Sequence, residues 1–282
     1  MEKFLIVNGD DFGCCKGVNE GIILAHKKGI LSSTTILAGG DAFSDAVKLA
    51  RENPKLSVGL HVCLLKCKPT LPFDKIPSLV DEKSGKFHPT LTSFLKAYSM
   101  GKIDKEDIYK EVEAQFEKLF DSGITPSHFD AHKHSFIFPP VRKIVFDVAE
   151  KFGVKVARFP FERKKYIYGF SSLPFYSVDV FKYLFKRDVE KRGFLTPQNF
   201  FGLVKTGKWS KEILFRMIEN MREGINELMT HPGIYDESLE KNETRLKKER
   251  EVELKLLMNG EIISFLEKKN VKIVSYRIFE EI

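Results

Sequence analysis

Short apolar or β-branched runs alternate along the chain with longer segments in which apolar residues recur at helical spacing. This alternation is typical of α/β proteins, in which mostly parallel strands are joined by helices. One such unit is clear near the amino terminus, where a helical pattern over 18–28 separates two strand-like runs and stops at Gly29. The pattern predicts a barrel-like number of strands, which are Phe4–Asn8, Ser33–Ala38, Ser57–Leu64, His128–His134, Lys155–Phe159, Asn226–Thr230 and Lys272–Ile278.

Two segments carry the clearest amphipathic patterns, and we expect both to be helices of an outer layer: Asp104–Phe120 and Arg245–Leu266. Two other segments break the alternation. Residues 66–91 contain several prolines and a Ser-Gly pair, which predicts a long loop over one end of the sheet. Residues 161–209 are rich in aromatic residues and lysine. We interpret them as a peripheral helical insertion, either a lid or wall beside a site or an ordinary pair of helices.

The composition is that of a globular protein. The chain has 282 residues, of which 43% are hydrophobic and 30% charged, so it contains enough apolar material for a large core. The apolar run near the amino terminus, Phe4–Val7, is too short for the hydrophobic region of a secretory signal. No run approaches the roughly 18 consecutive apolar residues of a membrane span. We therefore expect a cytoplasmic protein without a membrane partner.

Neither the net charge nor the cysteines point strongly to a nucleic-acid or structural-zinc function. Lysine and arginine outnumber aspartate and glutamate by 46 to 39, a net charge of +7 that could suit nucleic acid. Positive and negative side chains alternate, however, as in Lys247–Glu251, which is typical of a solvated helix face. The cysteines lack paired CxxC spacing, so we expect buried, reduced thiols at Cys14, Cys15, Cys63 and Cys67.

Most of the histidines lie in or just after predicted strands, where the ligand end of a parallel barrel is found. In the segment His128–His134, the period of two of an extended strand places three further polar side chains on the face of His128: Asp130, His132 and His134. Imidazole and carboxylate groups on one face suit a divalent cation, although a polar surface strand would show the same pattern. His61 interrupts an apolar run, so it needs a ligand or a buried polar partner.

Further candidates follow other strands. Asp10 and Asp11 come directly after the first strand, and alternation along the backbone would point them in different directions. One carboxylate could then be a ligand and the other a general base, while a turn or helix cap is the simpler interpretation. His231 precedes a rigid Pro-Gly turn. Arg158 ends an apolar run and could pair with a catalytic carboxylate or form a structural salt bridge.

Taken together, four motifs resemble those of the YdjC-like carbohydrate deacetylases, which include chito-oligosaccharide deacetylases: Asn8-Gly9-Asp10-Asp11-Phe12-Gly13, Gly59-Leu60-His61, His128-x-Asp130-x-His132-x-His134 and Thr230-His231-Pro232-Gly233. Their order and spacing match over nearly the whole chain. The resemblance implies an irregular (β/α) barrel related to the NodB-type polysaccharide deacetylases. It also implies a single domain over 1–282, with the insertion at about 161–209 on its periphery.

The resemblance further implies removal of the N-acetyl group from an amino sugar or a short chito-oligosaccharide. A magnesium or zinc ion would be held by Asp11, His61 and His132, with Asp10 as base and His231 as the candidate acid. Arg158 would assist the reacting groups, and the supporting residues would be His128, Asp130 and His134. His134 remains an alternative to His132 as ligand. Val62-Cys63, where the family more often has a small polar residue after the histidine, leaves the preferred sugar open.

Other functions stay open at this point. A metal-dependent phosphohydrolase of a small anionic substrate would suit the basic charge but needs more carboxylates or a second metal. A non-haem iron oxygenase could use two histidines and a carboxylate, but that class usually sits on antiparallel barrels. A basic nucleic-acid-binding protein would have merely structural histidines. We expect a small N-acetylated sugar as the partner, and the sequence leaves both a monomer and a homodimer open.

Overall fold

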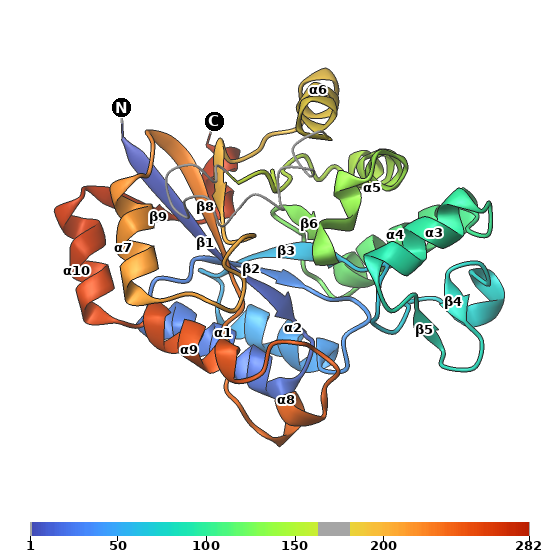
Figure 1. Cartoon of the computed structure of the whole chain (residues 1–282), viewed down its shortest axis with the longest axis horizontal. Coiled ribbons are helices and arrows are strands. Elements are labelled where there is room, and N and C mark those ends of the chain that lie inside the picture. Colours follow the sequence, from blue (N-terminus) through green and yellow to red (C-terminus); the bar gives the residue numbers. More distant parts are fainter. Residues whose placement is uncertain (1, 163–180, 282) are drawn as a thin grey trace.

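The computed structural model describes residues 2–162 and 181–281. Its centre is a curled sheet of parallel strands in the order β6-β3-β2-β1-β8-β7, with β9 also paired to β1 (Figure 1). The strands are β1 (Lys3–Phe12), β2 (Ser33–Ile36), β3 (Ser57–Val62), β6 (Phe129–Ala131), β7 (Asn199–Phe201), β8 (Gly224–Thr230) and β9 (Val271–Val274). The expected α/β class and irregular barrel are therefore confirmed.

Strand β1 organises the sheet. It pairs with β8 from Lys3 to Gly9 along one edge. Along the other edge, β9 covers its first residues and β2 its last ones, so two strands share this edge. The buried side chains of β1 include Leu5, Ile6 and Val7, which are at most 1% exposed. Burial on both faces is typical of a parallel strand covered by helices.

Helices connect the strands and cover the sheet (Figure 1). They are α1 (Lys16–Lys28), α2 (Phe43–Glu52), α3 (Leu91–Ser99), α4 (Lys105–Asp121), α5 (Pro139–Lys151), α6 (Lys182–Arg192), α7 (Lys211–Glu219), α8 (Glu237–Lys241), α9 (Lys248–Leu257) and α10 (Gly260–Lys268). The predicted helix before Gly29 and the predicted helix beginning at Asp104 are confirmed; Asp104 caps α4 by accepting a hydrogen bond from the backbone N–H of Glu106. The loop predicted at 66–91 also holds a short hairpin, β4 (Val80–Asp81) with β5 (Lys86–Phe87).

Four predicted elements differ in the structure. The strand predicted over Lys272–Ile278 ends at Val274, and a 3-10 helix, Tyr276–Glu280, follows. The helix predicted over Arg245–Leu266 is two helices, because Asn259 caps a new one by accepting hydrogen bonds from the backbone N–H groups of Glu261 and Ile262. The run Lys155–Phe159 makes only isolated bridges, Ala157 to Phe129 and Val156 to Leu195. The strand predicted over His128–His134 ends at Ala131, and a 3-10 turn, His132–Ile137, follows.

The segment predicted as a peripheral insertion is only partly described, since 163–180 lie outside the described residues. Within it, α6 packs Phe185 into the main core. Its later part is not peripheral, because β7 pairs with β8 in the central sheet. Among the described residues, no helix is long and apolar enough to cross a membrane.

Glycine at position 21 lets α1 approach the turn that follows β8. A Cβ on Gly21 would lie 2.4 Å from the Cα of Gly233, closer than real atoms approach. We therefore expect Gly21→Ala to destabilise the protein by about 1–3 kcal/mol through overpacking, measured by chemical denaturation. Gly260→Ala is the matched control, because no atom lies within 4 Å of a Cβ there. Equal stability of both variants would contradict the close approach.

Candidate functional site

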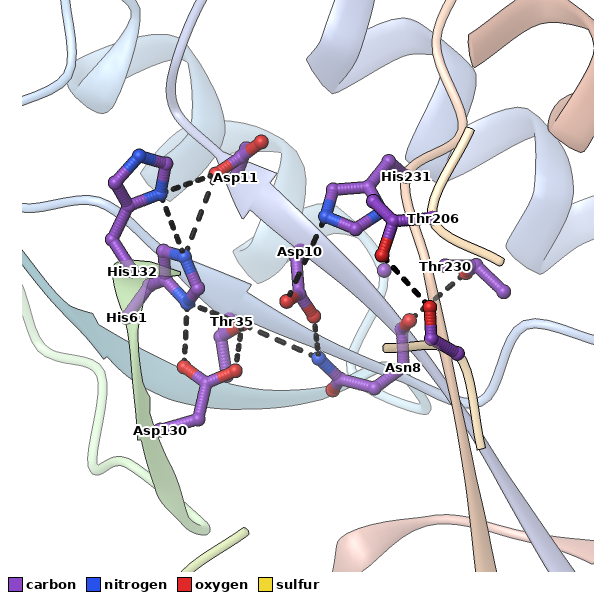
Figure 2. A network of polar contacts seen from close by, with 12 residues as sticks. Asn8, Asp10, Asp11, Thr35, His61, Asp130, His132, Thr206, Thr230 and His231 are labelled. Carbon is purple, nitrogen blue, oxygen red and sulfur yellow. Dashed lines mark hydrogen bonds and ion pairs between the residues drawn. The ribbon is translucent and has the colours of Figure 1, made fainter. Parts of the chain in front are cut away.

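Polar side chains from four parallel strands meet at the carboxyl end of the sheet (Figure 2). Asp10 and Asp11 lie at the end of β1, His61 on β3, His132 just after β6, and His231 just after β8. Together they line a cavity of about 380 Å³. The convergence expected for the ends of parallel strands is thus found.

The end of β1 explains how two adjacent aspartates reach one cavity. Asp11 has a φ of 69°, and the register with β2 shifts between Gly9 and Phe12. Left-handed backbone is uncommon outside glycine and often marks a functional site. The irregularity lets the adjacent Asp10 and Asp11 both line one cavity, which strict alternation would not allow. The carboxylates of Asp10 and Asp11 nevertheless have different partners.

Asp11, His61 and His132 form a compact group that fits a divalent cation. The Oδ1 atom of Asp11 lies 3.4 Å from Nε2 of His61 and 3.3 Å from Nδ1 of His132. The two ring nitrogens are 3.3 Å apart. Atoms at these separations can all lie about 2 Å from one ion. The buried Oδ1 forms no hydrogen bond with any described residue, which leaves it available as a ligand.

His61 is oriented by Asp130 from the neighbouring strand β6. Nδ1 of His61 lies 2.6 Å from Oδ1 of Asp130, and the Thr35 hydroxyl donates to the other oxygen at 3.2 Å. A proton on Nδ1 leaves Nε2 free to face Asp11 and His132, the usual arrangement of a metal-binding histidine. Burial alone would lower the pKa of His61, but the carboxylates of Asp130 and Asp11 raise it well above its usual value.

Asp10 is held by Arg158, whose guanidinium donates to both carboxylate oxygens at 2.7 Å. The same guanidinium lies 2.5 Å from Asp130 and 2.8 Å from Glu227. Burial would raise the pKa of Asp10, but Arg158 holds it well below its usual range. Asp10, His61 and Asp130 are also close enough to suggest a second metal group. The Arg158 guanidinium already occupies oxygens of both Asp10 and Asp130, so the group around Asp11 is the better fit for a cation.

The remaining candidate histidines differ in environment. Nε2 of His231 lies 4.0 Å from Asp10, and burial lowers its pKa to about 4. His134 lines the same cavity, but its backbone is left-handed and it does not share the strand face predicted for it. Burial lowers its pKa to about 3. His128 lies deeper, stacked on Tyr276 with ring centroids 3.5 Å apart and with Nε2 3.2 Å from Asn8 Oδ1.

The family comparison agrees with this arrangement. The family model described as YdjC-like protein matches residues 4–268. The chain belongs to the YdjC-like family. A relative named carbohydrate deacetylase from Thermoanaerobacter pseudethanolicus is 31% identical over 99% of this chain and 100% of its own. One of the same name from Listeria monocytogenes is 31% identical over 97% of this chain and 98% of its own.

Solved structures extend the likeness to three dimensions. An Enterococcus faecalis protein named for a proposed cleavage of cellobiose phosphate shares the fold at a TM-score of 0.81 and 26% identity, over 99% of both chains. A lactam utilization protein from Thermus thermophilus has a TM-score of 0.51 at 12% identity, covers 98% of this chain and all of that one, and supports the fold alone.

Three buried charged residues of this YdjC-like site escape the sequence analysis, and one is Glu227 on β8, which is 0% exposed and lies 2.8 Å from Nε of Arg158. Arg250 lies in the charged run interpreted as a solvated helix face, yet its side chain is 0% exposed and donates to Asp11 Oδ2 at 2.5 Å. The expectation for that run is therefore wrong at this position. Glu253 accepts a hydrogen bond from the backbone N–H of His231 at 2.6 Å. Burial raises the pKa of Glu253 to about 7. The sequence offers one signal for Arg250 and Glu253: they are three residues apart and so lie on one face of the helix.

A second cavity of about 230 Å³ adjoins the first and shares Asp11, His132 and Lys133 with it. Basic side chains dominate its lining, and they are Lys66, Lys68, Lys86, Lys133, Lys241 and Arg245. Lys68 pairs with Asp41 and Lys86 with Glu243, each at 2.7 Å. The expected excess of positive charge is thus gathered partly beside the site.

Metal binding distinguishes the two histidines that compete for the ligand position. We expect His132→Ala to weaken binding of a divalent cation by at least about 100-fold, because one of three ligands is lost. His134→Ala, the matched control from the same turn, should leave affinity within about threefold. Calorimetric titration of the chelator-treated protein measures both. A larger loss for His134→Ala would move the ligand assignment to His134.

Proposed function

We propose that this protein is a metal-dependent carbohydrate deacetylase that hydrolyses the N-acetyl group of an amino sugar or a short chito-oligosaccharide. The observation that carries the proposal is the adjacency of two carboxylates at the end of β1. Asp11 faces two histidines, and Asp10 is held ionised by Arg158 at 2.7 Å. Relatives that match nearly the whole chain are named carbohydrate deacetylase, which supports the same reaction.

Asp11, His61 and His132 would hold the cation, and magnesium or zinc both suit this mixture of carboxylate and imidazole ligands. A bound divalent cation would supply polarisation of the amide carbonyl and a lowered pKa for nearby water. Asp130 fixes the ring of His61 through Nδ1, at 2.6 Å. The protein's own contribution is therefore to orient three ligands and to keep both aspartates charged.

Asp10 is the proposed general base. Its bidentate contact with Arg158 keeps the carboxylate ionised and fixes its orientation. His231, with a pKa of about 4, is neutral at pH 7 in the free protein, so it must receive a proton before acting as an acid. His231 would take up the proton that Asp10 removes from water, and its Nε2 atom lies 4.0 Å from Asp10 before any ligand is bound. His231 then protonates the departing amine.

A phosphohydrolase is the second candidate, favoured by the basic side chains of the adjoining cavity. Such enzymes commonly use a second metal to clamp the reacting oxygens. The group that could offer one, around Asp10 and Asp130, is occupied by the Arg158 guanidinium. The site therefore favours amide hydrolysis with one cation.

Acetate release tests the proposed reaction. Metal-loaded protein is incubated with N-acetylated mono- and disaccharides and, in parallel, with sugar phosphates, and both acetate and phosphate are measured. We expect acetate only, and Asp10→Asn should lower the rate by about 10²- to 10⁴-fold, the usual contribution of general base catalysis. Asp74→Asn is the control, because Asp74 is largely exposed and does not line the cavity. Phosphate without acetate would favour the phosphohydrolase.

A further inference from the structure

One turn of helix α9 contacts both halves of the site. Arg250 donates a hydrogen bond to Asp11. Glu253, three residues later on the same face of the helix, accepts one from the backbone N–H of His231. The two side chains are 0% and 2% exposed, whereas Glu249 and Val252 on the same turn are exposed. A solvated helix would gain nothing from burying these charges, and burial without a partner is costly. Their placement therefore needs an explanation in the site.

The Arg250 side chain is fixed at several points. Its Nη2 atom donates to Asp11 Oδ2 at 2.5 Å and to the Thr244 hydroxyl at 3.1 Å, and Nε donates to the Leu246 carbonyl at 3.3 Å. Its aliphatic stem packs against Gly233, where a Cβ would lie 3.2 Å from two Arg250 carbons. The guanidinium is thus held in one place before any ligand arrives.

This contact restricts what Asp11 can offer to a cation. With Oδ2 engaged by Arg250, only Oδ1 faces His61 and His132. A carboxylate that binds through one oxygen occupies one coordination position, which leaves more positions for water and substrate. The positive charge of Arg250 also opposes the cation and weakens its binding.

Glu253 acts on the part of the site that contains His231. Its Oε2 accepts from the His231 backbone N–H at 2.6 Å, and its Oε1 accepts from the Gly207 N–H at 3.1 Å. The carboxylate therefore ties the turn after β8 to the loop that contains Thr206, another side chain of the cavity lining. The position of the His231 ring, 4.0 Å from Asp10, depends on this backbone contact.

We propose that α9 is a positioning element of the site, in which Arg250 makes Asp11 a one-oxygen ligand and Glu253 sets the position of His231. The proposal rests on the proposed function, and it assigns roles to two residues that act through their contacts with Asp11 and His231. Both are positioning residues. Their effects are separable, because Arg250 acts on the cation and Glu253 on proton transfer.

Arg250 is tested by cation binding. The full chain is treated with chelator and titrated with zinc and with cobalt(II), whose visible absorption weakens as coordination number rises. We expect Arg250→Met to bind the cation at least about tenfold more tightly, because an opposing charge is lost. Its cobalt absorption should weaken as Asp11 turns to offer both oxygens, and its turnover should fall about 10- to 100-fold.

Two further variants keep this test decisive. Arg250→Lys retains the positive charge. Its cation affinity and cobalt spectrum should therefore be close to those of the unsubstituted protein. Lys255→Met, an exposed position of the same helix, should match the unsubstituted protein. If Arg250→Met does not fold, Arg250→Gln is the neutral variant to be measured. A neutral variant with unchanged affinity and spectrum would overturn the role of Arg250.

Glu253 is tested by backbone exchange and turnover. Glutamine in Glu253→Gln keeps only one accepting oxygen, so the backbone N–H of either His231 or Gly207 loses its acceptor, and we expect that amide hydrogen to exchange at least about tenfold faster. Turnover should fall about tenfold, with KM and cation affinity unchanged. Glu251→Gln, outside the cavity lining, is the matched control. Unchanged exchange at both His231 and Gly207 would overturn the role of Glu253.

The proposed function and this inference can fail separately. If the unsubstituted protein releases no acetate from any sugar, the deacetylase proposal fails. Cation affinity, the cobalt spectrum and amide exchange would still decide whether α9 positions Asp11 and His231, because none of them requires turnover.

Discussion

The site depends on keeping two neighbouring aspartates ionised in the interior. Asp10 is 2% exposed and Asp11 4%, and a buried carboxylate without a counter-charge would take up a proton. Each has its own arginine, Arg158 for Asp10 and Arg250 for Asp11, and both guanidinium groups are themselves 0% exposed. A protonated Asp11 would be a poor ligand and a protonated Asp10 no base. The two ion pairs are therefore the condition on which the other contacts rest.

The fold brings these charges together from distant parts of the chain. Arg158 follows a short run bridged to β6, and Arg250 comes from a helix beyond β8. Arg158 reaches the end of β1 because parallel strands direct their carboxyl ends to one edge of the sheet, whereas Arg250 reaches it from helix α9, which packs against α1. Pairing the aspartates with different arginines also separates their chemistry. Asp11 keeps one free oxygen among the histidines, while Asp10 is clamped through both.

Much of this arrangement can be predicted from the sequence, for identifiable reasons. The strand-like runs ending at Asn8, Leu64 and Thr230 locate the elements that carry the candidate residues, because apolar continuity marks buried parallel strands. Backbone irregularities are less accessible. The left-handed Asp11 and His134 depend on tertiary packing, so strict alternation misplaces both side chains. Arg250 is missed because local charge pattern reports the average helix face, whereas its burial is decided by Asp11, far away in the sequence.

The pairing of β1 has a consequence for biosynthesis. Residues 224–230 pair with one edge of β1, and residues 271–274 with part of the other edge. The central strand therefore cannot complete its pairing until segments more than two hundred residues later in the chain have been synthesised. Such non-local pairing is slow and leaves a strand edge exposed in the meantime. The edges of β1 are therefore open to aggregation until β8 and β9 have left the ribosome, and chaperones that shield strand edges would matter most during that interval.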